Sequence, residues 1–304
     1  MNTLSSGLSY LDLLFQGKPR VIATGVLSGP GGVALVDPGP SSSLPTLRSE
    51  LAAAGIAMRD VTSLLVTHIH LDHSGAAGTL VQENPALKVF VHEKGAPHLA
   101  DPGKLLASAS RLYGDAMDRL WGEVRPVPAA ALVILKGGET IERGGRRLEV
   151  AYTPGHASHH VSYLAADAGV AFVGDTAGVK VVPDGEVLPP TPPPDIDLEA
   201  WHRSLDLFER WRPDTLFLTH FGPSAPTGPH LSILRERLEM ASRLVKASLE
   251  REGTDADRET WFADECRREL RRHMIEVDAQ TQELAGRFDL SWRGLARYWR
   301  KKGN

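Results

Sequence analysis

Cysteine is almost missing from the sequence, since Cys266 is the only one among 304 residues. A single thiol cannot form a disulfide within the chain, and any metal site must be built from nitrogen and oxygen ligands. Long apolar segments are missing too: no run approaches the ~18 residues of a membrane-spanning helix, and the start lacks a basic region followed by an apolar one. We therefore expect a cytoplasmic protein with no membrane partner.

An excess of basic residues is the third absence. Lys and Arg number 34 against 38 Asp and Glu, a formal net charge of −4. The acidic excess lies in residues 1–229, whereas residues 230–304 are slightly basic. A protein that binds nucleic acid needs a Lys/Arg-rich surface for the phosphates. We therefore expect a small-molecule substrate and no nucleic acid, and a homodimer stays open.

Short apolar runs alternate with helical patterns up to about residue 229. We predict strands over residues 20–27, 32–39, 63–68, 88–93, 148–155, 161–167, 170–175 and 215–220. We predict helices over residues 44–55, 74–82, 102–124 and 197–211. This alternation is typical of an α/β domain, here residues 1–229. Only helical patterns follow, which predicts a small helical C-terminal domain over residues 230–304.

The densest cluster of titratable residues is "HIHLDH", residues 68–73, directly behind the apolar run "LLV". His68 and His70 are two residues apart in an extended chain and project to the same side. Asp72 and His73 follow at an expected helix start. Four such side chains in a small volume are costly unless a positive charge lies among them. The pattern therefore predicts a bound divalent metal ion.

Three further residues of metal-ligand type stand directly after apolar strand patterns: His156, Asp175 and His220. In α/β architectures the carboxyl ends of strands form the ligand-binding rim, so we expect these side chains to meet the first four. The combined set offers five imidazoles and two carboxylates. One metal ion takes three or four protein ligands and would leave several without a role. The set therefore predicts two metal ions.

The motifs "THIHLDH", "TPGH", "VGD" and "LTH", in this order and spacing, resemble those of the metallo-β-lactamase-fold hydrolases over about residues 20–225. The resemblance implies an αβ/βα sandwich of two mixed sheets with external helices. It also implies that the ligands form two groups of three joined by one bridging carboxylate. These are His68, His70 and His156; Asp72, His73 and His220; and Asp175 as the bridge. Zinc is the expected metal, with iron and manganese as alternatives.

Within this superfamily the sequence is most similar to the glyoxalase II-type thioesterases, which share the full ligand set and carry a helical C-terminal domain. True β-lactamases of the fold are normally exported and lack the bridging aspartate. The usual "TPGHTxGS" of the glyoxalase II pattern reads "TPGHASHH" here, with His159 and His160 where glycine and a small residue are common. These two histidines could contact the metals or the substrate, or they could have a structural role in a turn; both interpretations stay open.

Two cations that share a water lower its pKa from ~16 toward ~7, so hydroxide exists at neutral pH. We expect a metal-bridging hydroxide to attack an ester, thioester or lactone carbonyl, with Asp72 as the catalytic residue that handles the proton. Two alternatives stay open, a phosphodiesterase on the same fold and a persulfide dioxygenase with a single iron. A binding protein without catalysis would be expected to have lost ligands.

Two segments between the ligand-bearing strands are expected to form the pocket wall, residues 102–124 and "PPTPPPD", residues 189–195. The first carries an apolar stripe that includes Trp121, with Tyr113 beside it. The stripe either packs on the core or faces the metals. In the second case the pocket is apolar with few cations and favours an uncharged acyl group over a polyphosphate.

Overall fold

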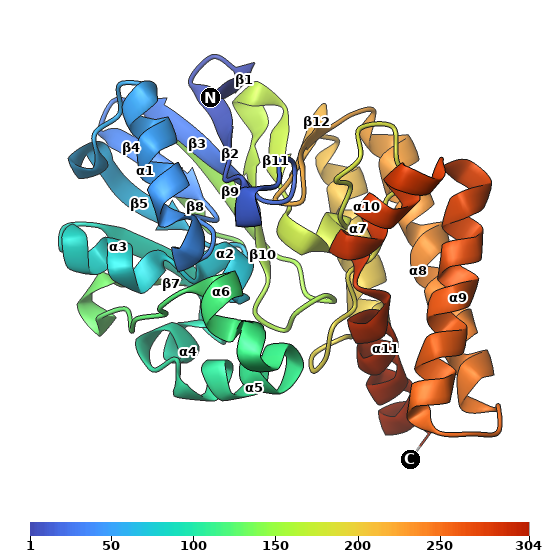
Figure 1. The fold of residues 1–304 in the computed structure, drawn as a ribbon. Coiled ribbons are helices and arrows are strands. Elements are labelled where there is room, and N and C mark those ends of the chain that lie inside the picture. Colours follow the sequence, from blue (N-terminus) through green and yellow to red (C-terminus); the bar gives the residue numbers. More distant parts are fainter. Residues whose placement is uncertain (304) are drawn as a thin grey trace.

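Two β-sheets lie face to face between layers of helices in the computed structural model, which describes residues 1–303 (Figure 1). In spatial order, the strands of the seven-stranded sheet are β1 (Asn2–Ser5), β2 (Leu8–Asp12), β3 (Ala23–Gly29), β4 (Gly32–Val36), β5 (Val61–Leu65), β6 (Lys88–His92) and β7 (Leu132–Leu135). Those of the six-stranded sheet are β13 (Gly222–Ser224), β12 (Thr215–Leu218), β11 (Val170–Phe172), β10 (Val161–Ala165), β9 (Arg146–Tyr152) and β8 (Thr140–Arg143).

Both sheets are mixed. Strands β1 to β4 form an antiparallel meander, and β4 to β7 run parallel to one another. In the other sheet only β11 and β12 are parallel. Parallel neighbours need crossover connections, and helices supply them. These helices are α1 (Leu44–Ala53), α2 (Leu71–Ser74), α3 (Ala77–Glu83), α4 (Ala96–Ala100), α5 (Gly103–Tyr113), α6 (Met117–Trp121) and α7 (Leu198–Trp211).

The hydrophobic core is layered like the fold. Phe90 of β6 packs with Phe172 and Phe217 of the opposite sheet in the layer between the two sheets. Helix α1 buries Leu47 and Leu51, four positions apart on one face, against the outer side of the seven-stranded sheet. The α/β sandwich expected from the sequence is confirmed, and it brings the loops at the strand ends of both sheets together.

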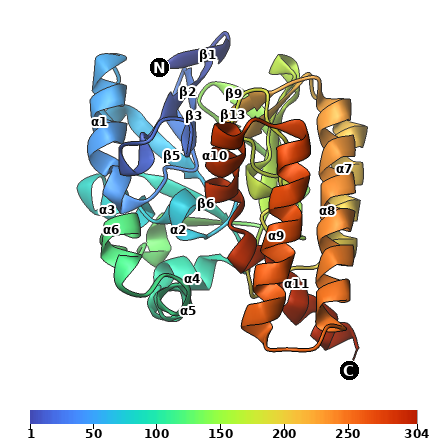
Figure 2. The same cartoon turned by 45° about the vertical axis from the view of Figure 1, so that its right-hand side comes forward.

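Four helices close the chain: α8 (Thr227–Leu249), α9 (Asp255–His273), α10 (Glu276–Gly286) and α11 (Phe288–Lys302). Helices α8, α9 and α11 stand on the side of the six-stranded sheet (Figure 2). They share one core with that sheet, in which Leu216 of β12 lies with Leu234 and Trp292. Cys266 is also buried there, and burial raises the pKa of its thiol to about 12. The division into domains at residues 229 and 230 stays a prediction.

The structure corrects several element boundaries. The helix predicted over residues 102–124 is broken into α5 and α6, because Gly114 adopts a φ of +50° between them. The strand predicted over residues 32–39 ends at Val36. Five short strands and two helices have no counterpart in the prediction: β1, β2, β7, β8, β13, α4 and α10. Within residues 1–303, no helix has both the length and the apolar character that crossing a membrane requires.

Candidate metal centre

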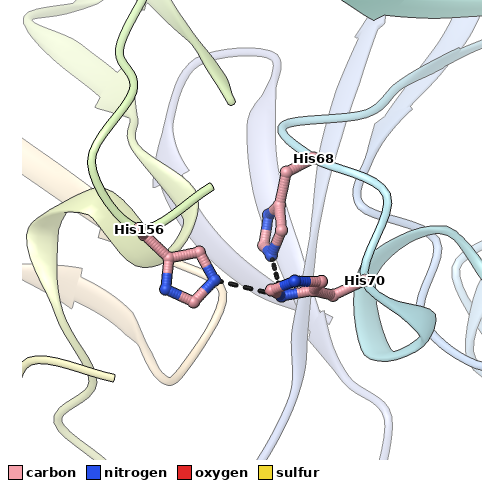
Figure 3. A group of neighbouring side chains, drawn as sticks. All are labelled: His68, His70 and His156. Atoms are coloured by element: carbon pink, nitrogen blue, oxygen red, sulfur yellow. Dashed lines mark hydrogen bonds between the residues drawn. The ribbon is translucent and has the colours of Figure 1, made fainter. Parts of the chain in front are cut away.

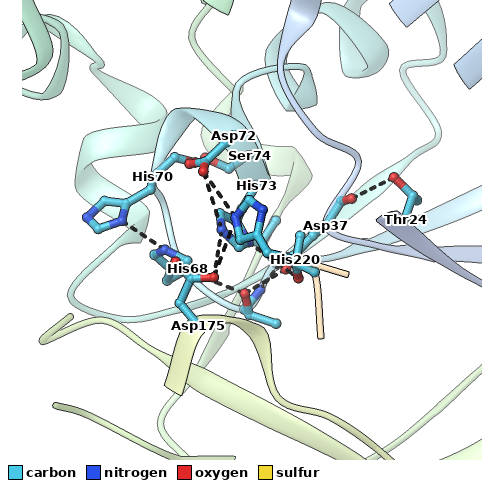
Figure 4. A network of polar contacts seen from close by, with 12 residues as sticks. Thr24, Asp37, His68, His70, Asp72, His73, Ser74, Asp175 and His220 are labelled. Atoms are coloured by element: carbon cyan, nitrogen blue, oxygen red, sulfur yellow. Dashed lines mark hydrogen bonds and ion pairs between the residues drawn. The ribbon is translucent and has the colours of Figure 1, made fainter. Parts of the chain in front are cut away.

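The seven side chains expected as metal ligands gather where strands of both sheets end (Figure 3 for His156, Figure 4 for the other six). From the seven-stranded sheet come His68 and His70, in the loop after β5, and Asp72 and His73 in the first turn that follows. From the six-stranded sheet come three residues in the segments after β9, β11 and β12, which are His156, Asp175 and His220. Residues that are far apart in the sequence thus meet at one place.

Three histidines form the first group, with their ring nitrogens converging (Figure 3). Nδ1 of His70 lies 2.9 Å from Nε2 of His68 and 3.0 Å from Nε2 of His156. Ligand atoms at ~2.0–2.1 Å from a tetrahedral zinc ion are roughly 3.3 Å apart. The nitrogens are therefore spaced as ligands of one common ion would be.

Asp72, His73 and His220 form the second group. Oδ2 of Asp72 lies 3.3 Å from Nε2 of His220 and 3.8 Å from Nε2 of His73. The group mixes one carboxylate with two imidazoles, a donor set that suits zinc, iron or manganese.

Asp175 lies between the two groups and presents one oxygen to each. Its Oδ1 is 3.3 Å from Nε2 of His73 and 3.6 Å from Nε2 of His220, both in the second group. Its Oδ2 is 3.5 Å from Nε2 of His156, in the first group. A carboxylate in this position can bind two ions at once.

Two buried atoms of the cluster lack hydrogen-bond partners within residues 1–303, Nε2 of His73 and Oδ1 of Asp175. They approach to 3.3 Å, but their geometry is not that of a hydrogen bond. Leaving a buried polar atom unpaired costs ~1–3 kcal/mol. A cation between them would satisfy both, so the residues present fit a metal centre.

The outward ring nitrogens of two ligands are held by backbone carbonyls. Nδ1 of His156 donates to the carbonyl oxygen of Pro190 at 2.8 Å, and Nδ1 of His220 donates to that of Val21 at 2.6 Å. Since each Nδ1 must carry the proton to make this bond, each Nε2 keeps its lone pair for a metal ion.

Asp37 fixes a third ligand and was not recognised in the sequence. Its buried carboxylate accepts hydrogen bonds from Nδ1 of His73 at 2.8 Å, from the backbone N–H and the hydroxyl of Thr67, both at 2.8 Å, and from the hydroxyl of Thr219 at 2.7 Å. Thr67 follows β5 and Thr219 follows β12, so Asp37 joins the two sheets beneath the cluster. The signal was present, because Asp37 directly follows an apolar strand just as the expected ligands do.

Burial keeps the imidazoles of the first group neutral. It is the main reason why the pKa of His68 lies well below its usual value, with repulsion from His73 as the next cause. Burial and the neighbouring His156 lower the pKa of His70 to about 4. A neutral imidazole is the form that binds a metal ion.

The carboxylates remain ionised although Asp175 is buried and Asp72 is partly buried. Burial opposes the ionisation of Asp72, but His73 and His220 lower its pKa to about 2. Burial also opposes the ionisation of Asp175, yet His73, His220 and His156 hold its pKa well below the usual range. The same carboxylates raise the pKa of His73 and His220 against the effect of burial. A divalent ion would replace the protons that these contacts hold.

A cavity of about 470 Å³ opens onto the cluster. Both segments expected in its wall line it, and so do residues at the junction of α10 and α11. Trp121 stacks on Phe15 with ring centroids 5.7 Å apart and meets the edge of Tyr113 at 5.0 Å. Three cationic side chains line the cavity as well: Lys94, Lys104 and Arg287.

His159 and His160 lie beside the cluster but belong to neither of the two ligand groups. The ring of His159 is nearly parallel to that of His68, with centroids 6.1 Å apart, and it lines the cavity. His160 is fully buried, its ring lies 5.1 Å from that of His68, and its Nδ1 is hydrogen-bonded to the hydroxyl of Thr153 at 2.9 Å. His159 alone of the two faces the space where a substrate would bind.

Comparison with known proteins agrees with this geometry. Residues 17–220 match the family model of the Metallo-beta-lactamase superfamily. A metallo-beta-lactamase fold-containing protein of Sulfurisphaera tokodaii is 31% identical over 212 residues, which cover 68% of this chain and 76% of that protein. A hydroxyacylglutathione hydrolase of Legionella pneumophila is 28% identical over 189 residues, 61% of this chain and 56% of the relative.

Among solved structures, a metallo-beta-lactamase family protein of Thermus thermophilus matches with a TM-score of 0.72 at 25% identity. The match covers 99% of this chain and 95% of the other. The C-terminal helices are therefore included in the similarity. By contrast, the chain spans only about half the length of the hydroxyacylglutathione hydrolase that it matches.

Proposed function

The chain belongs to the metallo-beta-lactamase superfamily and is a metal-dependent hydrolase, and from this premise we propose that it cleaves an ester, thioester or lactone with two divalent metal ions. The observation that carries the proposal is the position of Asp175, whose two oxygens face two separate ligand groups. We further propose zinc as the metal and a cytoplasmic small molecule as the substrate. Relatives that are named hydroxyacylglutathione hydrolases support a carbonyl as the point of attack.

The first ion would be held by His68, His70 and His156, and Asp175 would connect it to the second group. When bound, the two ions supply a water of lowered pKa and Lewis acids for the electrophilic oxygen and the leaving group. The protein residues keep the ligands in place, because the outward nitrogens of His156 and His220 are tied to the backbone.

Asp72 is the residue that we propose to move the proton. Its Oδ2 faces the second ligand group, whereas Oδ1 has no hydrogen-bond donor within residues 1–303. The side chain is 25% exposed and lines the cavity, while that of Asp175 is 6% exposed. Oδ1 of Asp72 can therefore accept a proton from the attacking water and pass it to the leaving group.

Kinetics on matched acyl and phosphodiester substrates test this function. We expect kcat/KM for a medium-chain ester, thioester or lactone to exceed that for a phosphodiester with a leaving group of the same pKa. The reverse order would replace the acyl hydrolase by a phosphodiesterase and leave the proposed metal centre intact.

Metal stoichiometry is a separate expected result. Protein purified without chelator and then saturated should hold close to two ions per chain by elemental analysis, because two groups of ligands share Asp175. Saturation at one equivalent in excess metal would contradict the bridging role. If that single ion were iron and thiol substrates drove oxygen consumption, a dioxygenase would be the better assignment.

The aromatic wall predicts an effect on substrate binding. Tyr113→Ala or Trp121→Ala should raise KM about tenfold and change kcat much less, since one aromatic contact is worth ~1–2 kcal/mol in both ground and transition states. Trp261→Ala, on α9 and outside the cavity lining, is the matched control and should leave both constants unchanged. A fall in kcat with KM unchanged would show that the two rings act on the metal centre and do not bind the substrate.

A further inference from the structure

Three side chains that carry hydrogen-bond donors form part of the cavity wall. They are Lys94, after the end of β6, Lys104 in the first turn of α5, and His159 in the loop that follows β9. We call these three side chains the donor wall. None of them is among the metal-ligand groups found within residues 1–303.

His159 is the buried member of the donor wall, with 8% of its surface exposed. Its Nδ1 accepts the backbone N–H of Ile69 at 3.4 Å, so the ring proton resides on Nε2. Within residues 1–303, Nε2 has no hydrogen-bond partner, and the ring meets that of His70 nearly edge-on with centroids 5.8 Å apart. His159 therefore offers an unused N–H to the cavity, next to the first ligand group.

Lys94 is held close to His159 by a short chain of hydrogen bonds. Its Nζ donates to the hydroxyl of Tyr152 at 2.8 Å, and that hydroxyl donates to the backbone carbonyl of Ser158 at 2.9 Å. The neighbouring Gly95 packs against the same loop, since a Cβ added there would lie 3.4 Å from Cβ of His159. The ammonium group is thus tethered to the wall of the cavity by its hydrogen bond to Tyr152, while the Lys94 side chain as a whole is exposed.

The positive charge of the donor wall is not neutralised by the protein. Neither Lys94 nor Lys104 has a carboxylate within 4.0 Å among residues 1–303, whereas the third cation of the cavity, Arg287, pairs with Asp289 at 2.7 Å. Apart from the metal ligands, one carboxylate lines the cavity in the described chain, that of Asp195. It already accepts the hydroxyl of Ser158 at 2.6 Å.

We propose that Lys94, Lys104 and His159 bind an anionic group of the substrate, a carboxylate or a phosphate, that is separate from the bond being cleaved. The ammonium groups of Lys94 and Lys104 and the neutral N–H of His159 can donate hydrogen bonds to the cavity but cannot accept them. This wall therefore favours an anion over a neutral amide or an alkyl group. The stacked rings of Phe15 and Trp121 take the uncharged part. The inference rests on the proposed acyl hydrolysis and narrows it to substrates with one apolar and one anionic part.

Two series of thioesters test the proposal on the metal-loaded enzyme. In the first series the acyl chain ends in a neutral amide, a carboxylate or a phosphate. In the second series the thiol part carries the same three groups. We expect kcat/KM for an anionic member of one series to exceed that of its neutral partner by about tenfold or more, the usual size of a charge-assisted contact. The series that shows the preference identifies whether the anionic group lies on the acyl part or on the thiol part of the substrate. The anion that is preferred identifies the group as a carboxylate or a phosphate.

Variants of the three side chains test whether the donor wall causes the preference for anionic substrates. The double variant Lys94→Met and Lys104→Met should bring the ratio of anionic to neutral kcat/KM close to one. His159→Phe keeps the ring against His68 but loses the N–H, so it should lower the ratio more than His159→Gln, which keeps a donor. Lys301→Met removes the same charge from the exposed end of α11 and should leave the ratio and the activity unchanged.

Binding of thioether analogues, which cannot be hydrolysed, gives a readout that does not depend on turnover. Calorimetry should show a tighter Kd for the anionic analogue in the wild type and equal Kd values in the double lysine variant. A wild-type ratio near one in both series, or a ratio that survives in the double variant, would overturn the proposal. If no thioester is cleaved but the anionic analogue still binds more tightly, thioester hydrolysis is removed from the proposed function and the anion subsite stands.

Discussion

Replacing Asp175 by alanine should empty the metal centre and abolish hydrolysis. The variant loses the oxygen that faces His156 and the one that faces His73 and His220, so each of the two proposed ions would lose a ligand. It also leaves imidazoles packed against each other without the carboxylate that stabilises a positive charge among them. We expect kcat/KM to fall by at least about 10³-fold, roughly 4 kcal/mol of transition-state stabilisation. Metal content after desalting should fall with it.

Elemental analysis and kinetics at saturating metal measure the two losses separately. Asp206→Ala removes an exposed carboxylate on α7 that pairs with Arg235 at the surface, and it serves as the matched control with no change in either quantity. Far-ultraviolet circular dichroism establishes that the variant is folded. Full metal content together with full activity in Asp175→Ala would refute the bridging position of this residue.

Replacing Asp72 by asparagine should separate metal binding from chemistry. The amide keeps the shape of the side chain and one oxygen, so His73 and His220 can still hold part of the metal. The amide cannot accept a proton as a carboxylate does, and general-base catalysis contributes about 10²–10⁴-fold. We expect kcat to fall within that range while KM changes little.

The control for this variant is its own metal content, measured in the sample used for kinetics. A loss of turnover in proportion to the loss of metal would make Asp72 a ligand only. Undiminished kcat at saturating metal would remove it from the proton transfer altogether.

The positions of the seven expected ligands could be read from the sequence because each follows a buried strand. His68 and His70 share one side of an extended segment, and such short-range geometry depends only on neighbouring residues. Which strand ends lie side by side is a long-range property. It was inferred from the general rule that the carboxyl ends of strands form the binding rim of α/β domains, and from the resemblance to a known fold. The alternation of strands and helices could also be predicted from the sequence, because apolar periodicity depends only on neighbouring residues.

Other features depend on contacts that no local pattern carries. Asp37 is hydrogen-bonded to Thr67 and Thr219, 30 and 182 positions away in the sequence. Its place after an apolar strand marks it as a candidate, but that it supports His73 and is not itself a ligand is visible only in three dimensions. Lys94 and Lys104 stand in segments where exposed lysines are common, and only the folded cavity distinguishes them from a solvated surface. The break between α5 and α6 depends on one residue, Gly114, whose positive φ ended a pattern that otherwise continues.

The ligands are distributed over both sheets, and this has a consequence for a chain that is still being synthesised. The first group is incomplete until His156 has been made, and the second until His220 has been made. A partial chain offers only fragments of a site, so metal capture follows the docking of the two sheets. Ions that bind the folded form alone draw the equilibrium away from the unfolded one. We therefore expect the metal-loaded protein to resist proteolysis for longer than the metal-free protein.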